Sequence, residues 1–118
     1  MISIEHEDQL TIVGIFGEFN VADYRKFEDE VSAQLKSRGQ LSLLIDLSGM
    51  LKYTLDVALE DIRFAREHAK DVGKIAIISD QDLVSWLAML TALFIDADIK
   101  VFDAESSARS WLAGGDTP

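Results

Sequence analysis

Apolar residues along this chain form short continuous runs that alternate with longer segments in which they recur every three or four positions. The run at residues 43–45 is apolar on both faces of an extended strand, which is typical of a strand buried between two layers. From Thr54 to Lys70 the apolar positions follow helical spacing. This pairing predicts a βαβ crossover, and therefore an α/β fold with a mostly parallel sheet.

The same pattern predicts five strands and four helices in the order ββαβαβαβα. Strands at residues 2–5 and 10–16 are expected to form an antiparallel hairpin at the sheet edge, and strands at 43–45, 74–78 and 98–102 complete a mixed sheet. Gly14 indicates a bulge or a close backbone approach within the second strand. We expect one domain over residues 1–113, with a flexible tail at 114–118.

Several polar residues follow the predicted strands and are expected to share one rim of the sheet, where ligand sites of such folds lie. They are Glu18, Asn20, Asp46, Ser48, Thr54, Asp56, Ser79 and Asp80. Asn20, Thr54 and Ser79 have a structural explanation, because they stand, like Asp103 after the last strand, where a helix needs a side-chain cap. A carboxylate at Asp46 must find donors, and loop N–H groups would supply them.

The segment at residues 83–95 is apolar almost all round, with Ser85 and Thr91 as its polar points. A helix of this kind must be covered on more than one side, which a domain of 118 residues does with difficulty. We therefore predict a homodimer interface or a groove for a small apolar, lipid-like molecule, and we favour the dimer. The predicted interface residues are Met50, Leu51, Tyr53, Leu83, Trp86, Leu87, Leu90 and Phe94.

Composition narrows the choice of partner. The 118 residues carry 21 acidic and 11 basic side chains, a formal net charge of −10, so nucleic acid and anionic membrane are poor partners. The apolar run at 83–95 is shorter than the roughly 20 residues of a membrane span. The absence of cysteine and of a signal-peptide pattern favours a cytoplasmic protein.

No catalytic constellation is evident, and the sequence predicts neither an enzyme nor a cofactor or metal site. The two histidines, His6 in a predicted turn and His68 near a helix end, are remote from the rim. Neither a phosphate-binding glycine loop nor a metal-ligand spacing is present. A hydrolase with paired carboxylates stays open for so acidic a chain, without a specific motif to support it.

The segment IDLSGM at residues 45–50 resembles the D-L-S-G-V that closes the central strand of STAS domains. Together with YTLDVALEDIRFA (53–65), IAIISD (75–80), DIKVF (98–102) and the apolar residues of the last two helices, it resembles the SpoIIAA-like proteins, in an uncharacterised bacterial branch. These are grouped with STAS domains and the CRAL-TRIO lipid-carrier fold. The resemblance implies a βα superhelix and no enzymatic activity.

The resemblance also implies an alternative function, that of a regulatory protein of the anti-sigma-factor-antagonist kind. Those proteins carry D-S-S-G at the start of the second helix, where a partner kinase phosphorylates a serine. The motif falls on Thr54-Leu55-Asp56-Val57, so both serines are replaced and Asp56 would imitate a permanent charge. Thr54 and Ser48 are the remaining phosphorylation candidates.

Overall fold

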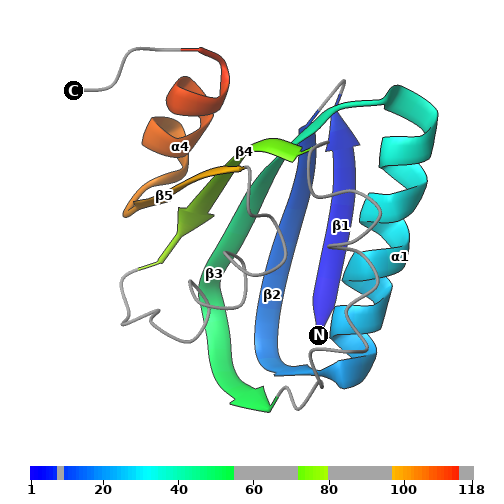
Figure 1. Ribbon diagram of the computed structural model, residues 1–118. Helices are drawn as coiled ribbons and strands as arrows, with labels where there is room; N and C mark the ends of the chain where they lie inside the picture. The colour runs from blue at the N-terminus through cyan, green and yellow to red at the C-terminus, as the bar shows by residue number, and fades with distance from the viewer. Residues whose placement is uncertain (8–9, 55–71, 80–96, 115–118) are drawn as a thin grey trace.

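The computed structural model describes residues 1–7, 10–54, 72–79 and 97–114 (Figure 1). Its elements are β1 (Ile2–Glu7), β2 (Leu10–Asn20), α1 (Val21–Arg38), β3 (Leu41–Thr54), β4 (Val72–Ile78), β5 (Asp98–Phe102) and α4 (Glu105–Leu112). The predicted helix at 83–95, and the helix at 54–70 after its first residue, lie outside the described residues.

The strands form one five-stranded sheet in the order β1-β2-β3-β4-β5. β1 runs antiparallel to β2, and every other neighbouring pair is parallel. This confirms the edge hairpin and the mixed, mostly parallel sheet. The runs that are apolar on both faces lie in the interior strands, and the more polar β1 and β5 lie at the edges, where one side of a strand has no partner.

Two hydrophobic clusters cover the two faces of the sheet. The run at 43–45 divides between them, because Leu43 and Ile45 face the α1 side while Leu44 faces α4. The α1-side cluster contains Val13, Ile15, Leu43, Ile45, Ile75 and Ile77, among others. The α4-side cluster contains Leu44, Ala76, Ile78, Phe102 and Ala108. In Figure 1, α1 lies beside β1 and α4 beside β4 and β5.

Helix α1 follows the predicted pattern at both ends. Asn20 caps it: its side chain accepts a hydrogen bond from the Asp23 N–H at 3.0 Å, and the Asp23 carboxylate accepts one from the Asn20 N–H at 3.2 Å. Gly39 ends the helix with a φ of +84°, which favours glycine. Its buried face consists of Tyr24, Phe27, Val31 and Leu35.

The predicted ends of the second and third strands are wrong. The apolar pattern predicts strands over 10–16 and 43–45, yet β2 runs to Asn20 and β3 to Thr54, through Ser48 and Gly49. Register shifts between β2 and β3 absorb the irregular residues, so pairing resumes beyond them. The Ser-Gly pair therefore bends the strand without ending it.

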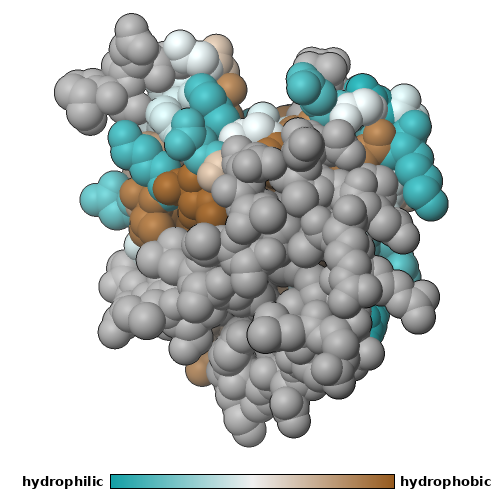
Figure 2. All heavy atoms as spheres, viewed as in Figure 1, coloured by the Kyte–Doolittle hydropathy of each residue, from teal (hydrophilic) through white to brown (hydrophobic). Residues whose placement is uncertain are grey.

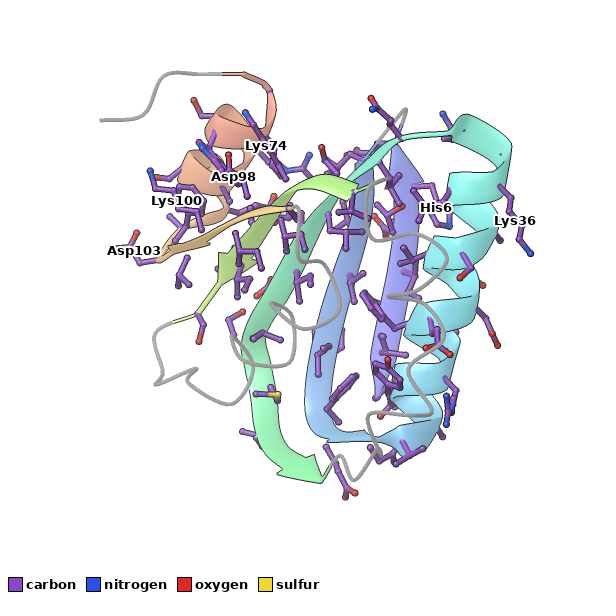
Figure 3. The ribbon with its side chains drawn as sticks, viewed as in Figure 1. His6, Lys36, Lys74, Asp98, Lys100 and Asp103 are labelled. Atoms are coloured by element: carbon purple, nitrogen blue, oxygen red, sulfur yellow. The ribbon has the colours of Figure 1, made fainter. Side chains whose placement is uncertain are left out.

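The predicted cap of the last helix is also wrong. Ala104, which has no side-chain acceptor, occupies the capping position of α4, and Asp103 lies one residue too early (Figure 3).

Hydrophobic residues reach the surface at the β5 edge, where Val101 is 41% exposed. Figure 2 shows hydrophobic atoms in the region that β5 and α4 occupy in Figure 1. Among the described residues, no helix is both long and apolar enough to cross a membrane.

Candidate functional site

Strands β2 and β3 project beyond the rest of the sheet at their carboxyl ends. β4 ends at Ile78, which pairs with Asp46, and β5 ends at the level of Ile78. β3 continues for eight more residues, paired with β2 as far as the Asn20–Thr54 pair. We call residues 16–20 and 49–54 the β2–β3 extension; it forms the lower end of the sheet in Figure 1.

Two irregularities in β3 determine which side chains the extension exposes. Between the pairs Gly14–Asp46 and Phe16–Gly49, β3 has one residue more than β2, and Leu51 is a second extra residue between Met50 and Lys52. Met50 packs into the α1-side cluster and is 6% exposed, whereas Leu51 is 87% exposed. A large apolar side chain is thus held in solvent by a hydrogen-bonded strand.

The Asp46 side chain stabilises the first irregularity. Its Oδ1 atom accepts hydrogen bonds from the Ser48 backbone N–H at 2.9 Å and from the Ser48 hydroxyl at 2.6 Å. Loop N–H groups were predicted to supply the donors; the structure instead supplies one backbone N–H from within β3 and one side-chain hydroxyl. The contact also ties down the Ser48 hydroxyl. A phosphate on Ser48 would lose this hydrogen bond and place its charge against a carboxylate, which is unfavourable.

His6 was predicted in a turn, but it lies in β1 opposite Thr11 and points toward α1 (Figure 3). Its Nδ1 lies 3.1 Å from the Thr11 hydroxyl, and its Nε2 lies 3.4 Å from the Glu30 carboxylate. A hydroxyl, an imidazole and a carboxylate in a row are the parts of a nucleophilic triad. Thr11 is completely buried, however, so a substrate carbonyl has no route to its oxygen, and we assign this row a structural role.

The described residues contain no group of three histidine, aspartate or glutamate side chains placed to hold a metal ion. The perturbed pKa values also have structural causes. Burial, followed by the neighbouring Glu28 carboxylate, raises the pKa of Tyr24 above its ordinary value. Hydrogen bonds to Glu7, followed by those to Glu105, raise the pKa of Arg109. Neither group lies on the β2–β3 extension.

The protein-family model described as SpoIIAA-like matches residues 10–113. The chain belongs to the SpoIIAA-like family. The match spans most of the chain, so the resemblance seen in the sequence is confirmed. A search of curated protein sequences finds no match.

Solved structures agree with this assignment. An uncharacterised protein of the DUF3478 family with a SpoIIAA-like fold, from Shewanella loihica, has a TM-score of 0.67 at 22% identity, over 95% of this chain and 92% of its own. The anti-sigma factor antagonist SpoIIAA in its unphosphorylated form has a TM-score of 0.64 at 12% identity, over 97% and 99%. An anti-sigma factor antagonist from Mycobacterium paratuberculosis has a TM-score of 0.56 at 15% identity, over 96% and 93%. At these identities the likeness establishes the fold alone.

The predicted site residues of this SpoIIAA-like chain fall into three groups. Met50 is buried in the core, and Leu51 is exposed at the extension. Tyr53 and Thr54 are the last two residues of β3, paired with Phe19 and Asn20. The remaining predicted interface residues lie outside the described residues, as do Asp56, His68 and Asp80. These remaining interface residues are Leu83, Trp86, Leu87, Leu90 and Phe94.

Sequence reasoning missed one exposed aromatic residue of the SpoIIAA-like sheet. Phe16 is 49% exposed, although it stands in a run that is otherwise apolar and buried. The available signal was the pair of glycines at positions 14 and 49. Only the strand register reveals that Gly49 is the cross-strand partner of Phe16 and that Gly14 precedes it by two residues on the same face.

Proposed function

We propose that this SpoIIAA-like protein is a non-catalytic regulatory module that acts by binding another protein through the β2–β3 extension. Leu51 carries the proposal, because an apolar side chain that is 87% exposed on a strand offers an anchor for a partner. A loop residue would lose conformational entropy on binding, whereas a residue flanked on both sides by paired strand positions has lost much of it already. Two structural relatives bear the name anti-sigma factor antagonist, which denotes action on another protein.

Regulation of this contact is assigned to Thr54. It ends β3, three residues after Leu51, and it is the first residue of the segment 54–57 onto which the family's D-S-S-G motif falls, at the position of the motif's aspartate. A phosphate adds a charge of about −1.5 to −2 and strong hydrogen-bond acceptors at neutral pH. At the end of β3, three residues along the chain from Leu51, such a charge would weaken docking onto an apolar pocket. Ser48 is the poorer site because its hydroxyl already donates to Asp46.

A second candidate function is a homodimer, or a groove for a small apolar molecule, that uses Leu51 together with the apolar segment at 83–95. Leu51 is the described residue that favours it, since a second copy or a ligand would also cover that side chain. Sedimentation of the purified protein at micromolar concentration tests the dimer. Native mass spectrometry of protein from its own cells tests the ligand, which would add mass to the chain.

Site-specific crosslinking separates these functions directly. A photoreactive amino acid is placed at Leu51 and, as the control, at Ser106, an exposed position on α4. The proposal predicts an adduct with one recurring different protein from position 51 and none from position 106. An adduct of twice the chain's own mass would favour the homodimer, and equal labelling from both positions would contradict a specific contact at the extension.

Phosphorylation is tested with the crosslinked partner, or with an anti-sigma kinase of the same cells, and labelled ATP. We expect phosphate incorporation into the wild type and into Ser48→Ala, with loss in Thr54→Ala. Incorporation that survives in Thr54→Ala would remove the regulatory role of this hydroxyl. The binding role of Leu51 would be unaffected by that result.

A further inference from the structure

The second sheet face, opposite α1, is covered unevenly. Helix α4 packs over β3, β4 and β5, burying Leu44, Ala76 and Ile78. Over β1 and β2 the same face carries Ile12, which is half-buried, and Phe16, which is 49% exposed. Figure 1 shows α4 beside β4 and β5, away from β1. An apolar part of the sheet is therefore accessible next to the part that α4 covers.

The Phe16 ring lies against two glycines on this face. A Cβ atom on Gly49 would lie 2.9 Å from Phe16 Cδ1, and one on Gly14 would lie 3.2 Å from Phe16 Cε2 and Cζ. The ring thus occupies the space that side chains at both positions would fill, and packing against the backbone restricts its motion. Because half of its surface remains exposed, the side of the ring away from the glycines is available to a ligand.

Two acidic residues, Asp46 and Glu5, lie on the same sheet face as the ring. Asp46 is the cross-strand partner of Gly14 on one side and Ser3 is its partner on the other, so Asp46 lies beside the ring. Oδ1 of Asp46 accepts two hydrogen bonds from Ser48, and no donor among the described residues contacts Oδ2. Strand alternation also places Glu5, the exposed partner of Ile12, on this face.

Two described cations that contact β1 or β2 are already engaged. The N-terminal ammonium donates hydrogen bonds to the backbone oxygen of Phe16 at 3.0 Å and to the Asp23 carboxylate at 3.2 Å. Arg109 of α4 donates to Glu7 Oε2 and to Glu105 Oε2, each at 3.0 Å. With a net charge of −10, the protein has a surplus of carboxylates that a basic partner would complement. An aromatic ring with a carboxylate beside it is the combination that an arginine side chain satisfies, because guanidinium stacks on the ring face and pairs with the carboxylate.

We propose that Phe16 and Asp46, with Gly14 and Gly49 beneath the ring, form a docking site for an arginine in a basic segment of a partner protein. We call these four residues the Phe16 platform. The inference goes beyond the function proposed for Leu51, because it assigns a second surface and the chemistry of what binds there. The two proposals can fail independently, since Leu51→Ser tests the role of Leu51 as an anchor and Phe16→Leu tests the Phe16 platform.

The probe is a synthetic peptide of alternating arginine and leucine, titrated into the isotopically labelled protein and followed by NMR. A concentration of about 150 mM salt screens attraction beyond roughly 8 Å. We expect chemical-shift changes to centre on residues 3–5, 12–16 and 46–49. The same peptide with citrulline for arginine keeps the shape without the charge and should not bind.

Three variants distinguish docking from diffuse attraction. Phe16→Leu keeps an apolar side chain but removes the ring, and should weaken binding about twofold to fivefold. Asp46→Asn keeps an acceptor for Ser48 and should weaken binding by about the same factor. Asp29→Asn removes the same charge from an exposed position on α1 and should leave the affinity almost unchanged. Urea unfolding of each variant confirms that it is folded.

Two results would overturn the proposal. One is equal weakening by Asp29→Asn and Asp46→Asn with no effect of Phe16→Leu, which would mean that the peptide responds to overall charge. The other is a set of shift changes centred on α1 or α4, which would place the peptide elsewhere. Absence of binding by the arginine peptide in the wild type would also contradict the platform.

Discussion

Replacement of Gly49 by alanine tests whether the Phe16 ring occupies the space above this glycine. The new Cβ atom would lie 2.9 Å from Phe16 Cδ1 and 3.3 Å from the Ile15 carbonyl oxygen. Overpacking of this kind costs about 1–3 kcal/mol. The lower entropy of the unfolded chain returns about 0.4–1 kcal/mol for a glycine-to-alanine change. We therefore expect Gly49→Ala to lower the free energy of unfolding by about 0.5–2 kcal/mol.

A double-mutant cycle assigns this cost to the ring. In a Phe16→Ala background the closest contact of the new methyl group is gone and the contact with the Ile15 carbonyl remains, so the cost of Gly49→Ala should fall by at least about 1 kcal/mol. Gly73→Ala is the matched control in β4, because no atom lies within 4 Å of its added Cβ. It should be neutral or slightly stabilising.

Urea unfolding followed by far-ultraviolet circular dichroism gives the four free energies of the cycle, provided that the slopes agree. Equal costs of Gly49→Ala in the presence and absence of the Phe16 ring would refute the reasoning. That result would place the ring away from Gly49, and the Phe16 platform would lose its support. A destabilising Gly73→Ala would show instead that alanine is unfavourable in these strands for another reason.

Three further predictions concern stability. Asn20→Ala should cost about 1 kcal/mol of unfolding free energy, because α1 loses its cap, and Asn20→Asp should restore most of it. Folding raises the pKa of Tyr24, so the protonated phenol contributes fully to the free energy of unfolding below its ordinary pKa of about 10. Above that pH the contribution declines, by up to about 1.4 kcal/mol per pH unit. Tyr24→Phe should remove this decline in urea midpoints measured as the pH rises; an unchanged decline would contradict the assignment. Met50→Ala should cost about 2–5 kcal/mol, whereas Leu51→Ser should change stability by less than about 0.5 kcal/mol; similar costs would contradict their opposite orientations.

The sequence predicted the layers of the fold well, because buried apolar residues recur at regular intervals along strands and helices. Leu43, Leu44 and Ile45 are all buried and divide between the two cores, as a strand between two layers requires. The cap at Asn20 and the glycine after α1 were equally readable, since both act on the backbone within a few residues. Such local and periodic signals do not depend on which strand lies next to which.

The β2–β3 extension could not be predicted, because it depends on pairing between distant residues. Ser48 and Gly49 are typical of a loop, yet β2 supplies a partner strand that keeps β3 extended through both. The outward turn of Leu51 follows from a register shift, which only the paired strands define. The exposed Phe16 was missed for the same reason, since its run is apolar and Gly49 lies 33 positions away.

The row formed by Thr11, His6 and Glu30 also depends on pairing between distant residues. No sequence pattern places a base beside a hydroxyl here, yet the structure does so by pairing β1 with β2 and packing α1 against them. Burial of Thr11 then removes the catalytic meaning of the arrangement. Proximity alone would have suggested an enzyme, and exposure decides against that interpretation.

We propose that Leu51, held out by the β2–β3 extension, anchors a different protein. The most direct test of this proposal is the affinity of the partner crosslinked at position 51, measured by titration calorimetry with the wild type and with Leu51→Ser. Burial of a leucine contributes about 1.5–3 kcal/mol, so we expect Leu51→Ser to lower the affinity by at least about tenfold and Ser106→Ala to leave it unchanged. Equal affinity of the wild type and Leu51→Ser would contradict it.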